Sequence, residues 1–224
     1  MTEVGVRGTG VVLELDLCRV FVAGFAGRDA ASVRAHLDEL AAIGVPIPDD
    51  VPTFYELDPA TLTTAPAISV ASGATSGEAE AVLVRHGGEY FVGVGSDHTD
   101  RDAERHDIGA SKAACPKPLS PRVVPLATCT AGGRWDGILI ESWVDGRPYQ
   151  SARLAGLRAP DDLLRRLELA LALAPDSDLV LFMGTPPLLD GEFRFGTEWL
   201  VRLGLPDGTD LKHSYTVERE SSDA

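Results

Sequence analysis

Residues 77–102 read GEAEAVLVRHGGEYFVGVGSDHTDRD, and this stretch decides the fold that the sequence predicts. Two apolar runs, 81–85 and 89–95, flank Gly87-Gly88, and two glycines in this position favour the primed turns of a β-hairpin. Both runs carry apolar residues on both faces, which is typical of buried strands. We therefore predict a hairpin whose two strands are flanked by core.

The turn also predicts the register of the two strands. If residues 87–88 form the loop, Glu80 lies opposite Gly95 and Glu78 lies opposite Asp97. Because side chains alternate with period two, all three carboxylates emerge on one face at the open end of the hairpin. Like charges roughly 5 Å apart on paired strands are destabilising unless positive charge lies between them. Oxygen ligands alone favour a hard ion, so we predict Mg²⁺ or Mn²⁺ at Glu78, Glu80 and Asp97. The alternative is an edge strand whose glutamates point to solvent.

Composition bounds the class of protein. With 224 residues and 44% hydrophobic content, the chain is expected to form a single domain over residues 1–224, with a disordered polar tail at about 218–224. Many glycines, prolines and short apolar runs favour a strand-rich α+β fold with few helices. The formal charge of −14 argues against nucleic acid and membrane surfaces as partners. No leader or long apolar run is found, so the cytoplasm is the expected compartment.

The cysteines give no sign of a disulfide framework or of a thiolate metal site. Cys18, Cys115 and Cys129 are odd in number, far apart in the sequence and in no C-x-x-C arrangement. We expect buried free thiols.

Periodicity and turn signals predict further elements, which are strands over 10–16, 19–24 and 179–183, helices over 30–43 and 160–171, and a second hairpin of 137–144 with 147–151. Asp29 is a candidate N-cap of the first helix, and Asp145-Gly146 is a strong hairpin turn signal. The proline-rich segment 46–66 is expected to be an extended loop. The polar stretch from Lys112 to Pro121 fits no periodic pattern and is expected to be an ordered loop.

Three further residues are candidates for chemistry or support. His36 and Glu39 lie three residues apart on the first predicted helix and therefore on one flank. A histidine there could act as a general base near neutral pH, or it could simply face solvent. His98 follows a predicted metal ligand, but alternation turns it to the opposite face, so we expect a structural role.

Taken in order along the chain, these motifs resemble the fumarylacetoacetate hydrolase-like superfamily, and particularly a little-characterised bacterial branch of it, a domain of unknown function. The resemblance rests on the strand RVFVAG at 19–24, the H-x-x-E pair His36/Glu39, the E-x-E pair Glu78/Glu80, SDHTDRD at 96–102, ASK at 110–112, DGRPYQ at 145–150 and LFMGTP at 181–186. The span from Glu80 to Asp97 is shorter than the family usually has.

The resemblance implies a mixed β-roll or sandwich with a few peripheral helices, and Mg²⁺ or Mn²⁺ held by Glu78, Glu80 and Asp97. It implies catalytic roles for His36, Glu39 and Lys112, and substrate binding by Arg101, Gln150 and Thr185. Alternatives remain open for several of these: a solvated lysine at position 112, a supporting ion pair of Arg101 with Asp102, and a strand-ending Thr185.

The implied activity is metal-dependent hydrolytic cleavage of a carbon-carbon bond in a small 1,3-dicarbonyl or 2-oxo acid. Decarboxylation, hydration and tautomerisation share an enolate-like intermediate and so remain alternatives, as does a non-catalytic small-molecule-binding protein on the same fold. The expected partners are a small anionic oxo acid and a second copy of the chain in a homodimer.

Overall fold

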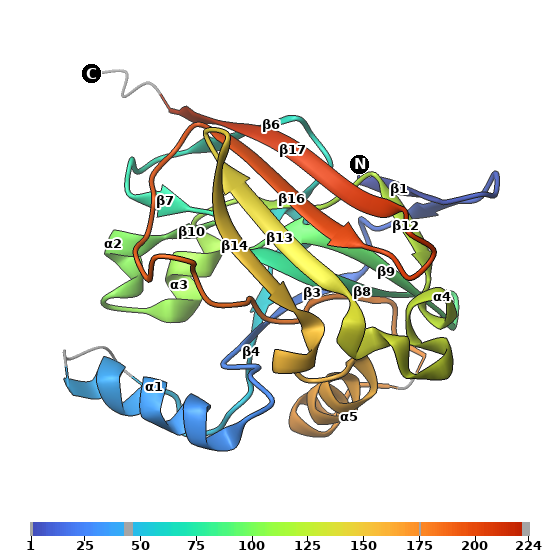
Figure 1. The fold of residues 1–224 in the computed structure, drawn as a ribbon, viewed down its shortest axis with the longest axis horizontal. Coiled ribbons are helices and arrows are strands. Elements are labelled where there is room, and N and C mark those ends of the chain that lie inside the picture. Colours follow the sequence, from blue (N-terminus) through green and yellow to red (C-terminus); the bar gives the residue numbers. More distant parts are fainter. Residues whose placement is uncertain (1, 43–46, 175, 221–224) are drawn as a thin grey trace.

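Two β-sheets form the body of the protein in the computed structural model, which describes residues 2–42, 47–174 and 176–220, without the side chains of His36, Glu39 and Leu40 (Figure 1). The larger sheet contains, in spatial order, β2 (Val12–Glu14), β1 (Glu3–Val6), β12 (Arg122–Pro125), β9 (Glu89–Ser96), β8 (Ala79–His86), β15 (Leu179–Phe182), β3 (Arg19–Gly24) and β4 (Thr53–Leu57). The smaller sheet contains β14 (Arg147–Arg153), β13 (Leu139–Val144), β16 (Glu198–Gly204), β17 (Asp210–Arg219) and β6 (Ala67–Val70).

Short strand pairs and helices complete the fold. The pairs are β7 (Thr75–Ser76) with β10 (Thr99–Asp100), and β5 (Leu62–Thr63) with β11 (Lys117–Pro118). The α-helices are α1 (Ala30–Ala42), α2 (Arg101–Glu104), α3 (Ile108–Ala113), α4 (Leu126–Thr130) and α5 (Pro160–Leu171). The 3₁₀ turns are η1 (Pro59–Thr61), η2 (Ala131–Gly137) and η3 (Leu154–Gly156). Helices therefore lie at the periphery of a strand-rich α+β fold (Figure 1).

The central strand β8 is buried on both faces, which explains its nearly unbroken apolar sequence. Ala81 and Leu83 belong to a core that also contains side chains of the smaller sheet, such as Ile140. Val82 and Val84 point into a second core on the other face of the larger sheet. A sheet that packs against another sheet and also curls over itself has a core on each of its faces. The predicted roll or sandwich is confirmed.

The register of the first hairpin is also confirmed. Glu80 pairs with Gly95, and the Asp97 backbone N donates to Glu78 O at 2.9 Å, so these two residues face each other. Gly87 and Gly88 both have positive φ, at 58° and 78°, as a primed turn requires. The alternative of an edge strand is wrong, because β9 and β15 flank β8.

Other predicted elements agree closely with the structure. The strand over 19–24 and the helix over 160–171 have the predicted bounds, and β13 and β14 form the second hairpin. The Asp29 carboxylate accepts hydrogen bonds from the backbone N of Ala31 and of Ser32, so it caps α1 as expected. The three cysteines are free and buried.

Two predictions of irregular structure are wrong. The segment predicted as an extended loop contains β4, which pairs with β3, and the short β5. The segment around Lys112 contains α3, capped by the Asp107 carboxylate, followed by β11. The predicted strand over 10–16 shortens to β2, whereas β17 continues to Arg219, inside the predicted polar tail. Residues 221–224 and the predicted helix end at 43–44 lie outside the described residues.

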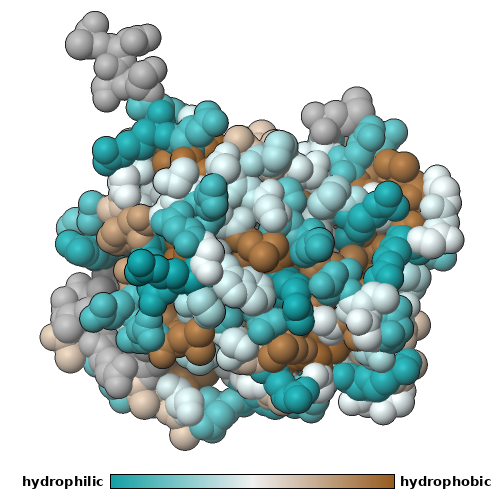
Figure 2. All heavy atoms as spheres, turned by 45° about the horizontal axis from the view of Figure 1, so that its top comes forward, coloured by the Kyte–Doolittle hydropathy of each residue, from teal (hydrophilic) through white to brown (hydrophobic). Residues whose placement is uncertain are grey.

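The surface is mixed in character. On the face shown in Figure 2, hydrophobic residues form several separate patches among hydrophilic ones. Within the described residues, no helix is long and apolar enough to cross a membrane.

Candidate active site

Three carboxylates meet at the open end of the β8–β9 hairpin. Glu80 lies in β8, Glu78 just before this strand, and Asp97 just after β9. One oxygen of each lies within 4.8 Å of the other two. Glu80 and Asp97 are buried, and the Glu78 side chain is 13% exposed. The cluster on one face that the hairpin register predicts is therefore present.

The electrostatics of this cluster favour a bound cation. Burial raises the pKa of Glu78, and burial together with the Asp97 charge raises the pKa of Glu80 well above its usual range. The Gly184 N donates to Glu80 Oε2 at 2.7 Å and orients that carboxylate. Buried oxygen donors so close together fit a hard divalent ion such as Mg²⁺ or Mn²⁺, whose charge would reverse both pKa shifts.

Two buried lysines already contact one member of the cluster. Lys112 Nζ contacts Asp97 Oδ2, and Lys117 Nζ lies 3.1 Å from Asp97 Oδ1. Burial alone would raise the pKa of Asp97, but the two ammonium groups overcome this and hold it well below its usual range. Burial lowers the pKa of Lys117, whereas the carboxylates raise that of Lys112 against the effect of burial.

Lys117 is a site residue that the sequence reasoning missed. Its Nζ also donates to the backbone oxygens of His98 and Lys112, so it ties α3 to the segment after β9. No signal along the sequence identifies it, because Pro116 and Pro118 favour an extended backbone but do not determine where the lysine side chain points.

Arg101 lies on the other side of the cluster, at the start of α2. Its Nη2 lies 3.2 Å from Glu78 Oε1, its Nη1 donates to Glu104 Oε2 at 2.8 Å, and its guanidinium sits 4.0 Å over the Phe193 ring. The alternative of an ion pair between Arg101 and Asp102 is not formed, because Asp102 faces Arg105 instead. Arg101 thus holds Glu78 in place while its aromatic contact reaches into the cavity described below.

His98 follows Asp97 directly and is hydrogen-bonded through both ring nitrogens. Its Nδ1 lies 3.0 Å from Tyr215 Oη and its Nε2 lies 2.9 Å from Thr75 Oγ1. Burial, with the charges of Lys117 and Arg101 added, lowers the pKa of His98 to about 3. The ring is therefore neutral at physiological pH, in agreement with the structural role expected from strand alternation.

Thr185 and Gln150 have different places in the structure. Thr185 lines the cavity directly after the turn that brings Gly184 to Glu80. Gln150 is buried, and its Nε2 donates to Thr185 Oγ1 at 2.7 Å and to Pro186 O at 2.8 Å. Its Oε1 accepts from Ala79 N at 2.8 Å. Gln150 therefore lies beneath Thr185 and is not among the residues that line the cavity, and its expected contact with substrate stays a prediction.

The predicted pair His36 and Glu39 lies in α1, but both side chains are outside the described part of the structure. The same helix contributes Ser32 and Val33 to the wall of the cavity that contains the carboxylate cluster. The backbone therefore places His36 within one helical turn of the lining residue Val33, and Glu39 within two turns.

The cavity has a volume of about 780 Å³, within the range of small-molecule sites. Its charged lining residues are Glu78, Glu80, Arg101, Glu104, Arg105 and Lys112. The remaining wall is largely apolar and includes Phe25, Val33, Ile108, Leu157, Leu188, Phe193 and Phe195. A ligand that has both an oxygen-rich polar group and an apolar part fits this mixture of charged and apolar lining residues.

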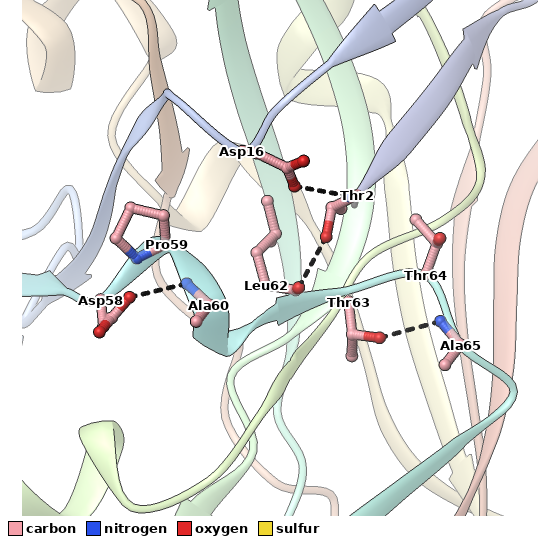
Figure 3. A pocket seen from close by; sticks show the side chains of 9 residues that line it. All are labelled: Thr2, Asp16, Asp58, Pro59, Ala60, Leu62, Thr63, Thr64 and Ala65. Carbon is pink, nitrogen blue, oxygen red and sulfur yellow. Dashed lines mark hydrogen bonds between the residues drawn. The ribbon is translucent and has the colours of Figure 1, made fainter.

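A second hollow of about 690 Å³ lies between the N-terminal segment and residues 58–65 (Figure 3). Both carboxylates of this hollow accept hydrogen bonds from backbone N–H groups. Asp16 accepts from Thr2 N at 2.6 Å, and Asp58 accepts from Ala60 N at 2.9 Å. Its other lining residues are threonines and apolar residues. We place the candidate active site in the cavity with the carboxylate cluster, since that is where perturbed acids and cations converge.

Comparison with solved structures gives close matches in fold. A candidate fumarylacetoacetate isomerase/hydrolase from Oleispira antarctica matches with a TM-score of 0.70 at 19% identity, over 97% of this chain and 100% of that one. A candidate fumarylacetoacetate hydrolase family protein from Yersinia pestis CO92 matches with a TM-score of 0.66 at 15% identity, over 97% and 100% of the two chains. A fumarylpyruvate hydrolase from Pseudomonas aeruginosa, solved with Mn²⁺ and pyruvate, matches with a TM-score of 0.64 at 19% identity, over 98% and 96%.

At such identities these likenesses show the fold alone. Among curated proteins no sequence match was found. The sequence profile of DUF2848, described as a protein of unknown function, matches residues 23–215, which is most of the chain and includes every candidate site residue named above. The chain therefore belongs to the DUF2848 family, and its fold is that of the fumarylacetoacetate hydrolase-like proteins.

Proposed function

We propose that the chain is a divalent-metal-dependent enzyme that cleaves a carbon-carbon bond in a small 1,3-dicarbonyl or 2-oxo acid by hydrolysis. The observation that carries this proposal is the meeting of Glu78, Glu80 and Asp97 beside a cavity that Glu78 and Glu80 line together with mostly apolar residues. The fumarylpyruvate hydrolase structure with Mn²⁺ and pyruvate supports the class of ion and of substrate.

The carboxylate cluster would hold Mg²⁺ or Mn²⁺. When bound, the ion would supply Lewis-acid polarisation of a substrate carbonyl. Lys112, buried beside the cluster with its pKa raised, carries a permanent positive charge toward the position where an oxyanion or enolate develops. Thr185 and Arg101 are two of the polar residues that line the cavity, and they could bind the substrate carboxylate.

The bond changes can be assigned to groups of this chain. His36, oriented by Glu39, would take a proton from water as the hydroxyl adds to the carbonyl carbon. The carbon-carbon bond then breaks, and its electron pair passes to the leaving fragment as an enolate. The proton that His36 has taken returns to the carbon of that enolate, which balances the reaction.

One observation favours a different function, that of a small-molecule-binding protein that uses no metal. Lys112 and Lys117 contact both oxygens of Asp97, and Arg101 lies beside Glu78. Three cations thus face the three carboxylates and could balance their charge without an added ion. The two functions make opposite predictions for metal dependence.

The test uses the full chain treated with a chelator and then supplied with Mg²⁺, with Mn²⁺ or with neither. Acylpyruvates, oxaloacetate and related diketo acids are offered to wild-type protein, to Glu80→Gln and to His36→Gln. Glu56→Gln serves as the matched control, because Glu56 lies on β4 and pairs with the exposed Arg19 outside the site.

The proposal expects turnover that requires the added ion and is lost in Glu80→Gln and reduced in His36→Gln, with Glu56→Gln equal to wild type. Binding of an oxo acid without turnover, and without any effect of Mg²⁺ on thermal unfolding, would instead establish the metal-free binding protein.

A further inference from the structure

A second group of ligating side chains lies at the opposite end of β8. Cys18 immediately precedes β3, Asp178 immediately precedes β15, and His86 is the last residue of β8. These three strands are neighbours in the larger sheet, in the order β8, β15, β3. The ends of three strands that are far apart in the sequence therefore lie side by side.

The strand register brings the three residues level with one another. Leu179 pairs with Arg19 on one side and with Arg85 on the other. One residue further toward the strand ends, Asp178 stands between Cys18 and His86. Residues that are level on neighbouring strands project from the same face of a sheet, so the three side chains point the same way.

The ligating atoms are close enough to share one ion. A sulfur of Cys18, a ring nitrogen of His86 and a carboxylate oxygen of Asp178 all lie within 4.8 Å of one another. Ligands around a tetrahedral Zn²⁺, at about 2.0–2.3 Å from the metal, are separated by about 3–4 Å. A small inward movement of side chains therefore completes the geometry.

The surroundings orient these atoms toward a common centre. Asp178 Oδ1 accepts from Gly87 N at 2.9 Å, which fixes the carboxylate and leaves Oδ2 beside His86. His86 Nδ1 lies 3.1 Å from this Oδ2, is shielded from solvent, and makes no hydrogen bond of acceptable geometry. A buried ring nitrogen without a hydrogen bond is costly, and a metal ion would satisfy it.

The chemistry of the group differs from that of the carboxylate cluster. A thiolate, an imidazole and a carboxylate suit a borderline-soft ion such as Zn²⁺, whereas oxygen ligands alone suit Mg²⁺. Burial, with the charges of Asp178 and Asp16 added, raises the pKa of Cys18 to about 11. The carboxylates of Asp178 and Asp16 beside this sulfur give surroundings in which a divalent cation is favourable.

We propose that Cys18, His86 and Asp178 form a second metal site that takes Zn²⁺ or a similar ion. The side chains of His86 and Asp178 are 31% and 34% exposed, so water can reach a fourth coordination position. The site joins the ends of three adjacent strands, and it lies about 20 Å along β8 from Glu80, given six residues at about 3.3 Å each. An ion that binds only the folded chain stabilises it.

The test follows Co²⁺, the spectroscopic substitute for Zn²⁺, added to the reduced and chelator-treated full chain. Thiolate coordination gives a sulfur-to-cobalt charge-transfer absorption in the near ultraviolet, which oxygen ligands cannot give. The variants are Cys18→Ser and His86→Gln. Because His86 is partly exposed, its variant keeps the test valid if Cys18→Ser fails to fold. The matched controls are Cys129→Ser, which removes another buried thiol, and Glu80→Gln, which alters the carboxylate cluster.

The proposal expects one thiolate-bound Co²⁺ per chain, displaced by Zn²⁺, present in both controls, and lost or weakened at least tenfold in His86→Gln and in Cys18→Ser. Zn²⁺ should also raise the unfolding temperature of the wild type but not of His86→Gln. The absence of the charge-transfer band in the wild type, or a band of equal strength in His86→Gln, would overturn the proposal.

Discussion

Lys112 Nζ contacts Asp97 Oδ2 in an ion pair whose two side chains are both buried. The lysine therefore occupies one oxygen of a carboxylate that the proposed function assigns to a metal ion. A fixed cation and a metal ion that share one carboxylate compete for it electrostatically, while both stabilise negative charge that develops on a substrate.

This competition predicts opposite effects on binding and on turnover. In Lys112→Met, affinity for Mg²⁺ should rise by about tenfold, or ~1.4 kcal/mol. Turnover should fall by about 10²–10³, the usual cost of removing one charge-stabilising donor. Calorimetric Mg²⁺ titration and steady-state kinetics measure the two effects. Lys212→Met, at an exposed position on β17, is the control. A weaker Mg²⁺ affinity in Lys112→Met would contradict the competition.

A second prediction concerns the turn at Gly184, whose N donates to Glu80. Gly184 has φ of +93°, and a Cβ there would lie 2.6 Å from Ala26 Cβ. Gly184→Ala should cost about 1–3 kcal/mol of unfolding free energy through strain, and should weaken Mg²⁺ binding by displacing the donor. Gly208→Ala is the control for backbone strain alone. Gly208 has φ of +82°, but a Cβ there would have no atom within 4 Å. Equal losses in both variants would show that the Gly184 contact is unimportant.

Gln150→Leu tests whether this residue positions the site or binds the substrate. The substitution leaves the backbone N of Ala79 and the hydroxyl of Thr185 without their buried partner, so about 1–3 kcal/mol of unfolding free energy should be lost. Thr185→Val should raise KM and should cost less stability than Gln150→Leu, because Gln150 Nε2 keeps Pro186 O as an acceptor. Urea unfolding and kinetics on both variants provide the measurement. Normal stability with a raised KM in Gln150→Leu would instead show that Gln150 contacts the substrate directly.

His98 predicts how stability depends on pH. Its pKa is about 6.5 in the unfolded chain and about 3 in the folded one, so below pH 6.5 the unfolded state binds a proton that the folded state does not. Stability from His98 is complete above that pH and declines by up to about 1.4 kcal/mol per unit as pH falls toward 3. Urea unfolding from pH 7 to 4 should give a shallower slope for His98→Asn than for wild type or for His106→Asn, at an exposed position. Equal slopes in all three proteins would argue against a neutral buried His98.

The sequence predicts those parts of the fold whose signals are local. The β8–β9 hairpin follows from its two-glycine turn and from apolar runs on either side, and the turn fixes which carboxylates face each other. β4 was missed because its proline-rich surroundings indicate a loop, whereas its strand character comes from pairing with β3, more than twenty residues earlier. α3 was missed because six residues are too few for a periodic pattern, although Asp107 is a recognisable cap.

The residues of the candidate site also fall into those that local sequence signals predict and those that only the folded topology brings together. Glu78, Glu80 and Asp97 are predictable because one hairpin places them together. Lys117 contacts Asp97 because the chain after β11 runs beside β9, where Leu119 bridges Gly95, and Gly184 reaches Glu80 because β15 lies beside β8. The group of Cys18, His86 and Asp178 spans three strand ends, and no spacing along the sequence could indicate it. Contacts of this kind depend on the topology of the whole sheet.

The most direct test of the central claim is Mg²⁺ binding by the full chain, measured calorimetrically for wild type and Glu80→Gln. Mg²⁺ is the appropriate ion because a thiolate and imidazole site binds it poorly. The account predicts one Mg²⁺ per wild-type chain, at concentrations that also restore turnover, and binding weakened at least tenfold in Glu80→Gln. Equal Mg²⁺ binding by the two proteins, or no binding by the wild type, would contradict it.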